Sequence, residues 1–163
     1  MTQRAHITNI LQIMDSIANL ELKLAEFYRE CGASWPAEKE LWSGLERDEM
    51  VHAQMIRKMA DIFLHRPEQF EGNRPFNVIS VSVAWAGVQN RLQELKEGRL
   101  GGANLLFIAR DIEQSLLEAK PGEILKSRDV EYQNLFQTMV SQTQTHKWKL
   151  EKKIEEMKNS HTG

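Results

Sequence analysis

The feature that most constrains this chain is a carboxylate and an imidazole three residues apart, Glu49 and His52, within an apolar stretch. On an α-helix, side chains at that spacing lie on one face, one turn apart. The same face carries apolar side chains: Leu41, Leu45, Met55, Ile56 and Met59. Burying a carboxylate and an imidazole in an apolar stripe is costly unless a partner compensates their polarity. A metal ion or a buried ion pair can do so, and the rest of the chain helps to choose between them.

Apolar residues recur at the 3.6-residue helical period over four long segments. We expect a first helix over 5–30 and a second over 36–65, with Gly32 and Pro36 marking the break between them and Pro67 ending the second. Residues 66–77 are rich in proline and glycine and predict a loop. Two further helices are expected over 103–119 and 129–158.

The segment between the two helix pairs is ambiguous, because apolar residues alternate at Ile79, Val81, Val83 and Trp85 as they would in a strand. No other segment offers a partner strand, and residues 91–100 have helical character, so we predict a helix over 80–97. This apolar crossover is expected to be either buried core or the contact of a homodimer.

The chain is therefore expected to form one all-α domain over 1–163: a four-helix bundle built from a helix pair over 5–65, a crossover over 66–102 and a second pair over 103–158. A homodimer is the expected assembly.

Five residues that can bind a metal fall on the inward stripes of the four main helices: Glu21, Glu49, His52, Glu113 and His146. Bundles that hold two metals use one Glu from each of two helices and Glu-x-x-His from each of the other two. The chain matches this scheme at five of six places, and Thr143 stands at the sixth. The two halves are also similarly spaced, since 31 residues separate Glu21 from His52 and 33 separate Glu113 from His146.

On these residues the chain resembles the rubrerythrin-like branch of the ferritin-like superfamily. The matching features are Glu21 followed by Phe27 and Tyr28, the Glu49-Met-Val-His52 run, Glu113 and His146, within 5–65 and 103–158. The resemblance implies a ferritin-like bundle, a di-iron site that reacts with peroxide or oxygen, and metal-binding roles for the five residues. Rubrerythrins proper also carry an iron domain with four cysteines. This chain has one cysteine, Cys31, so a redox activity would need an external electron donor.

The second departure from the family is Thr143, which replaces a bridging carboxylate. Three carboxylates and two neutral imidazoles leave one positive charge on two divalent ions. A bridging hydroxide or an exogenous carboxylate can cancel that charge, or else only one ion binds. The ligand types suit iron, and also manganese or zinc. Gln142 and Gln144 are expected to lie off the stripe.

Around the ligands, Glu46, Tyr28 and Tyr132 are candidates for an outer layer of contacts. The metal-free interpretation requires buried Glu21–His52 and Glu113–His146 pairs with Glu49 left over. Such pairs seldom add stability over apolar packing.

Three functions follow. The favoured one is a ferritin-like di-iron oxidoreductase that acts on peroxide, oxygen or Fe²⁺ with an incomplete ligand set. The alternatives are a protein that holds one metal for storage or sensing, and a degenerate bundle with only a structural or interaction role.

Composition indicates which classes of partner and which cellular compartment to expect. The formal charge of −2 gives no electrostatic basis for nucleic-acid binding. The longest uncharged stretch, around 77–90, is shorter than the roughly 20 apolar residues that span a membrane. The single cysteine suits a reducing compartment. We therefore expect a cytoplasmic protein without nucleic-acid or membrane partners, and with His6, His65 and His161 exposed.

Overall fold

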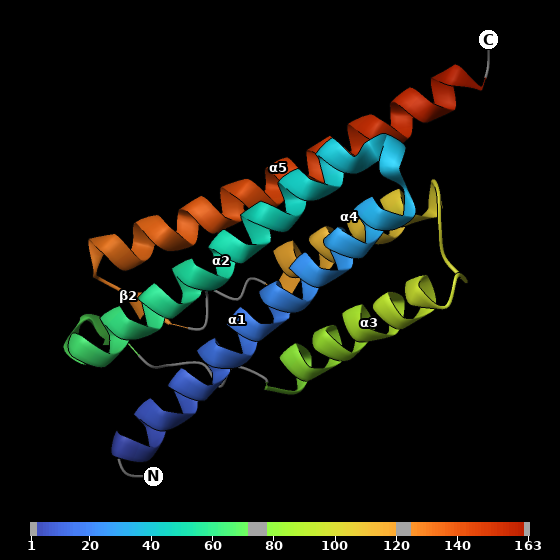
Figure 1. Ribbon diagram of the computed structural model, residues 1–163. Helices are drawn as coiled ribbons and strands as arrows, with labels where there is room; N and C mark the ends of the chain where they lie inside the picture. The colour runs from blue at the N-terminus through green and yellow to red at the C-terminus, as the bar shows by residue number, and fades with distance from the viewer. Residues whose placement is uncertain (1–2, 72–77, 120–124, 162–163) are drawn as a thin grey trace.

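The computed structural model describes residues 3–71, 78–119 and 125–161, and it confirms the all-α class. Five helices account for most of these residues: α1 (Gln3–Ser34), α2 (Lys39–His65), α3 (Val78–Lys96), α4 (Asn104–Ala119) and α5 (Val130–Ser160) (Figure 1). Single 3₁₀ turns, η1 (Pro36–Glu38) and η2 (Pro67–Gln69), flank α2 and begin at the prolines expected to bound it. None of the described helices combines the length and hydropathy needed to cross a bilayer.

The crossover segment is helical, as predicted, because its buried residues follow a helical period. Val81, Val88, Leu92 and Leu95 are buried, whereas Ile79, Val83 and Trp85 are exposed. The strand-like alternation of apolar residues is therefore not an alternation of burial. The helix α3 ends shortly before Gly98, whose φ of 73° lies in the left-handed region that glycine adopts without strain.

A short antiparallel pairing joins β1 (Phe70–Glu71) to β2 (Lys126–Ser127), with Phe70 opposite Ser127. The sequence gives no sign of it, because two-residue strands carry no periodicity. It brings the end of α2 close to the start of α5.

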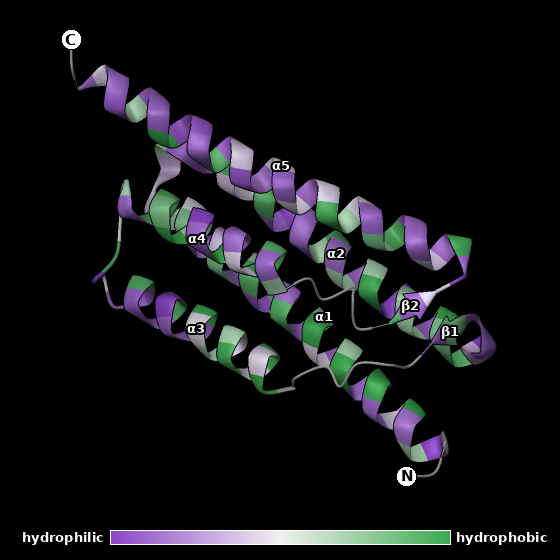
Figure 2. Ribbon diagram, turned by 180° about the vertical axis from the view of Figure 1, so that it is seen from behind, coloured by the Kyte–Doolittle hydropathy of each residue, from purple (hydrophilic) through white to green (hydrophobic). Residues whose placement is uncertain are grey.

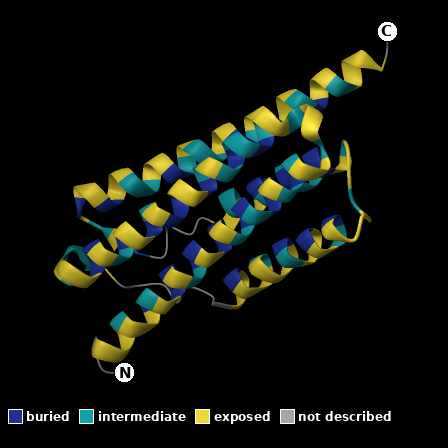
Figure 3. Ribbon diagram, in the orientation of Figure 1, coloured by how far each residue is buried: buried dark blue, intermediate teal, exposed yellow. Residues whose placement is uncertain are grey.

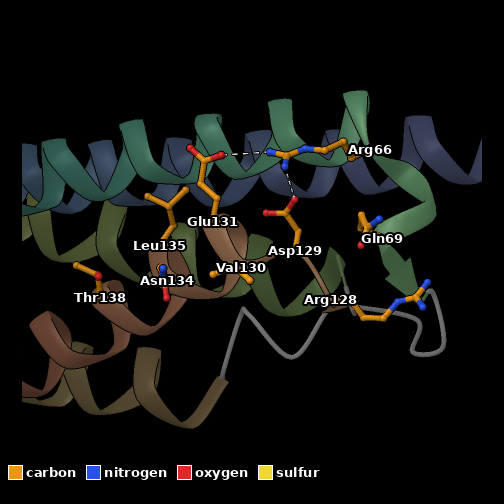
Figure 4. Close-up of a pocket in the computed structure, with 9 residues that line it drawn as sticks. All are labelled: Arg66, Gln69, Arg128, Asp129, Val130, Glu131, Asn134, Leu135 and Thr138. Carbon is orange, nitrogen blue, oxygen red and sulfur yellow. Dashed lines mark hydrogen bonds and ion pairs between the residues drawn. The ribbon is translucent and has the colours of Figure 1, made fainter.

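Ion pairs reinforce that junction. Arg66 reaches Asp129 at 2.7 Å and Glu131 at 3.1 Å across an open surface hollow (Figure 4). Asp129 also caps α5, since its side chain accepts a hydrogen bond from the backbone N–H of Tyr132. None of the five predicted metal ligands lines this hollow.

The main helices form two antiparallel pairs, α1 with α2 and α4 with α5, and α5 also lies along α2 (Figure 1). The crossover helix α3 packs on α1. Buried residues face the interior between these helices, while the outer faces are exposed (Figure 3). The C-terminal half of α5 is mostly hydrophilic (Figure 2), consistent with its alternating lysines and glutamates.

The buried apolar residues fall into two clusters. One is formed mainly by the N-terminal half of α1, the C-terminal half of α2 and the start of α5, and includes Ile10, Ile56 and Met139. The other is formed by the opposite halves of these helices together with α3 and α4, and includes Leu24 and Leu150. The chain changes from one cluster to the other near the middle of α1, α2 and α5. The five predicted metal ligands lie at that boundary.

Candidate metal centre

A layer of buried polar side chains separates the two apolar clusters. It contains all five predicted ligands, each at most 5% exposed: Glu21 from α1, Glu49 and His52 from α2, Glu113 from α4 and His146 from α5. On α1 the first cluster ends at Ala18 and the second begins at Leu20, so Glu21 falls at the boundary. Four helices thus place the five groups at one depth inside the protein.

The five side chains form two groups of three that share one member. Glu21, Glu49 and His52 make one group, and Glu49, Glu113 and His146 make the other. Within each group, one ligand atom per residue lies within 4.8 Å of the others. Glu49 stands between the two imidazoles, with Oε2 at 3.0 Å from His52 Nδ1 and Oε1 at 3.0 Å from His146 Nδ1. The metal-free interpretation left Glu49 unpaired, whereas Glu49 contacts both imidazoles and is the central carboxylate. Of the two pairs that this interpretation required, Glu113–His146 is present, with Glu113 Oε1 at 3.5 Å from His146 Nδ1.

The two histidines are oriented alike. His52 Nε2 lies 2.7 Å from Gln142 Oε1, and His146 Nε2 lies 3.0 Å from Asp48 Oδ2. An ionised carboxylate only accepts hydrogen bonds, so Nε2 of His146 carries the proton. In the neutral ring, Nδ1 then presents its lone pair to the carboxylates. Metal-binding histidines commonly use this arrangement, with the outer nitrogen donating to a carboxylate or carbonyl.

Four of the buried polar atoms that lack a hydrogen-bond partner among the described residues belong to this layer: Glu21 Oε2, Glu49 Oε1, Glu113 Oε2 and His146 Nδ1. Although His146 Nδ1 and Glu49 Oε1 are 3.0 Å apart, the two atoms do not meet the angular requirements of a hydrogen bond. Each buried polar atom without a partner costs about 1–3 kcal/mol. A divalent cation satisfies carboxylate oxygens and an imidazole lone pair together, so the residues fit a metal.

Without a metal, the layer holds protons instead. Burial raises the pKa of Glu21 well above its usual range, and the charge of Glu49 adds to the effect. The same two causes raise the pKa of Glu113 to about 7. Burial opposes the charged form of His146, but the carboxylates of Glu113 and Glu49 outweigh it and raise its pKa to about 10.

Glu49 behaves in the opposite way. Burial acts to raise its pKa, but the imidazoles of His146 and His52 outweigh burial and hold the pKa below its usual range. Glu49 is thus the carboxylate most readily ionised, as a ligand shared by two cations would need to be.

The position of Thr143 carries no ligand. Its hydroxyl donates a hydrogen bond to the carbonyl of Met139, one turn earlier in α5, at 2.9 Å. The neighbouring Gln142 corrects an expectation, since it is half-buried and contacts His52 instead of lying off the site. Gln142 is adjacent to the inward stripe of α5, yet its long side chain extends to α2 and contacts His52 there.

Contacts around the ligands partly match the expected outer layer. The hydroxyl of Tyr28 donates to Glu113 Oε1 at 2.5 Å, as a member of that layer would. Tyr132 packs instead on Phe70, within the first apolar cluster. Asp48, rather than Glu46, binds an imidazole. The side chain of Asp48 is 41% exposed. Asp48 therefore does not stand out from the sequence as a buried acid on an apolar stripe would.

The remaining candidates lie away from the layer. His6, His65 and His161 are exposed, as expected. Cys31 is buried, and burial raises the pKa of its thiol above the usual range, so it stays protonated.

Comparison with protein-family models, with curated proteins and with solved structures found no match for this chain.

Proposed function

We propose that this protein binds two divalent transition-metal ions inside a ferritin-like bundle. Glu21, Glu49 and His52 would hold one ion, and Glu49, Glu113 and His146 the other. The observation that carries this proposal is the pair of three-residue groups sharing Glu49, with ligand atoms within 4.8 Å of one another. Mixed carboxylate and imidazole ligands suit iron, manganese and zinc. The resemblance to rubrerythrins favours iron.

The surrounding residues support this assignment through their hydrogen bonds. Gln142 and Asp48 accept from the outer nitrogens of the two imidazoles and so keep Nδ1 turned inward. Tyr28 donates to Glu113 and holds that carboxylate in place. Such outer contacts commonly change metal affinity by tenfold to a hundredfold.

With iron bound, the centre would supply redox chemistry toward peroxide, oxygen or further Fe²⁺. The chain itself supplies ligands and a site shielded from water by the two apolar clusters. Electrons would come from an external donor, because one buried cysteine provides no second iron centre.

A second candidate is a protein that binds a single metal for storage or sensing. The observation that favours it is Thr143, whose hydroxyl is committed to Met139 and contributes no negative charge. Two divalent ions bound by three carboxylates would retain one positive charge. That charge lowers the affinity for the second ion unless another anion binds.

Metal stoichiometry separates the two candidates. The purified chain is reconstituted with Fe²⁺ without oxygen, desalted, and analysed for iron per chain and for peroxide consumption. Two irons and loss of peroxide would support the redox proposal, and one ion without turnover would support the binding protein. Fewer than about half an ion per chain would refute both.

A pair of variants on α2 tests the location. His52→Ala should lose most of the bound metal, because His52 is a proposed ligand. His65→Ala changes an exposed histidine of the same helix and should retain all of it. Equal metal content in the two variants would mean that the ions bind elsewhere.

A further inference from the structure

A cavity of about 300 Å³ lies between α1, α3 and α4. Its walls are mainly aliphatic and include Leu20, Leu24, Val81, Val88, Ile108 and Ile112. The cavity exists because α3 packs chiefly on α1 while α4 packs chiefly on α5, which leaves the facing sides of α3 and α4 apart. Its volume is at the lower end of the roughly 300–1,000 Å³ of small-molecule sites.

One buried carboxylate connects this cavity to the polar layer. Glu21 lines the cavity and also belongs to the first group of three ligands. Its side chain is 5% exposed, and Oε2 has no hydrogen-bond partner among the described residues. The lining also includes Ser80, Arg91, Asp111 and Ser115. Among the lining residues, Glu21 is the one that belongs to the proposed metal centre.

We propose that the cavity binds a medium-chain aliphatic carboxylate, with its alkyl chain between α1, α3 and α4 and its carboxylate at the metal centre beside Glu21. The volume accommodates roughly ten groups of the size of a water molecule, at about 30 Å³ each, which corresponds to a chain of eight to ten carbon atoms. The aliphatic walls favour an alkyl chain over a hydrated ion.

The direction of the ligand follows from charge. This step depends on the proposed function, because two divalent ions held by three carboxylates leave one positive charge at the Glu21 end. The carboxylate could instead bind Arg91, which also lines the cavity. However, Arg91 is exposed, and its guanidinium is already paired with Glu94 at 3.0 Å. The metal end therefore offers the uncompensated charge that a carboxylate needs.

Calorimetric titration of the zinc-loaded chain with hexanoate, octanoate and decanoate tests the proposal without redox turnover. Because each buried methylene contributes about 0.8 kcal/mol, binding should tighten by roughly tenfold for every two carbons until the cavity is full. Metal-free protein should bind decanoate at least tenfold more weakly than zinc-loaded protein. Equal affinity in the two forms would overturn the proposal.

Two glycine variants provide a matched pair. Gly87 on α3 lines the cavity, Gly44 on α2 does not, and a Cβ at either position meets no atom within 4 Å. Leucine is also a better helix former than glycine, so both variants should fold. Gly87→Leu should weaken decanoate binding at least tenfold, and Gly44→Leu should leave it unchanged.

Zinc content, measured for each protein, distinguishes failure of the cavity proposal from failure of the proposed metal centre. A chain that holds two zinc ions but binds no decanoate would refute the cavity ligand and leave the metal centre standing. A chain that holds no zinc would refute the proposed function and the metal-directed carboxylate with it. If Gly87→Leu altered the sedimentation mass instead of ligand affinity, a second copy of the chain would be the occupant, which would also overturn the proposal.

Discussion

Replacing Glu49 by glutamine should empty both halves of the proposed centre, because Glu49 is the residue that the two groups of ligands share. The substitution preserves the size of the side chain and removes one negative charge. The carboxylate oxygens of Glu49 lie 3.0 Å from Nδ1 of His52 and of His146. The amide of glutamine would also place N–H donors at a site where the metal needs lone pairs. We expect the variant to hold less than half an ion per chain under conditions in which the parent protein holds two.

The expected magnitude follows from the loss of charge. At about 4 Å and an effective dielectric constant near 20, a carboxylate interacts with a divalent ion by about 8 kcal/mol. If water and the amide oxygen recover half of that energy, the remaining energy of about 4 kcal/mol corresponds to roughly a thousandfold in dissociation constant for each ion. Two divalent ions would also face only two carboxylates, which leaves two positive charges in a buried layer.

Zinc titration by calorimetry and elemental analysis after dialysis measure the effect, with circular dichroism to verify the helices. Glu46→Gln is the matched control, since Glu46 lies one turn earlier on α2 and belongs to neither group of ligands. It should bind zinc as the parent does. A Glu49→Gln protein that is folded and binds two ions with affinity within threefold of the parent would refute the shared-ligand assignment.

Three further outcomes are expected. Thr143→Glu should restore a fourth carboxylate and raise the affinity of the weaker ion at least tenfold in zinc titrations; unchanged binding would show that another group already fills that position. Tyr28→Phe removes the hydrogen bond to Glu113, so the metal-free protein should lose about 1.5–3 kcal/mol and melt roughly 3–12 °C lower; an unaltered melting temperature would contradict this. The pKa values of Glu113 and His146 are raised, to about 7 and about 10, so the folded state binds more protons than the unfolded state and their stabilisation is lost as pH rises through those values. Chelated protein should therefore be less stable in urea at pH 9 than at pH 6, while zinc, which displaces the protons, should bind at least tenfold more tightly at pH 8 than at pH 6.

Helix positions were predictable because the signals that set them are local. The apolar period and the prolines Pro36 and Pro67 placed α2 to within a few residues of Lys39–His65. The helix α3 was predicted on other grounds, namely the helical character of residues 91–100 and the lack of a partner strand, because the apolar residues at its start alternate as in a strand. The two-residue strands at Phe70 and Lys126 left no such signal, since their pairing depends on where α2 and α5 meet.

The five polar residues of the central layer were also evident from the sequence, because ionisable groups within an apolar stripe stand out from their neighbours. Which of them would touch was not evident. The metal-free interpretation of the sequence required Glu21 with His52 and Glu113 with His146. The structure has the second contact, at 3.5 Å, but it also puts Glu49 next to both histidines. Periodicity gives the face of a helix but neither its height nor its rotation against another helix.

For this protein, then, the sequence by itself determined the helical elements and the identity of the buried acids and imidazoles, since both follow from residue spacing along one chain. Only the tertiary structure decided that Gln142 and Asp48 orient the imidazoles, that the hydroxyl of Thr143 donates to a carbonyl of its own helix, and that Glu21 lines a cavity. Those features depend on contacts or gaps between side chains of different helices, or on a choice of rotamer, and no pattern along the chain encodes them.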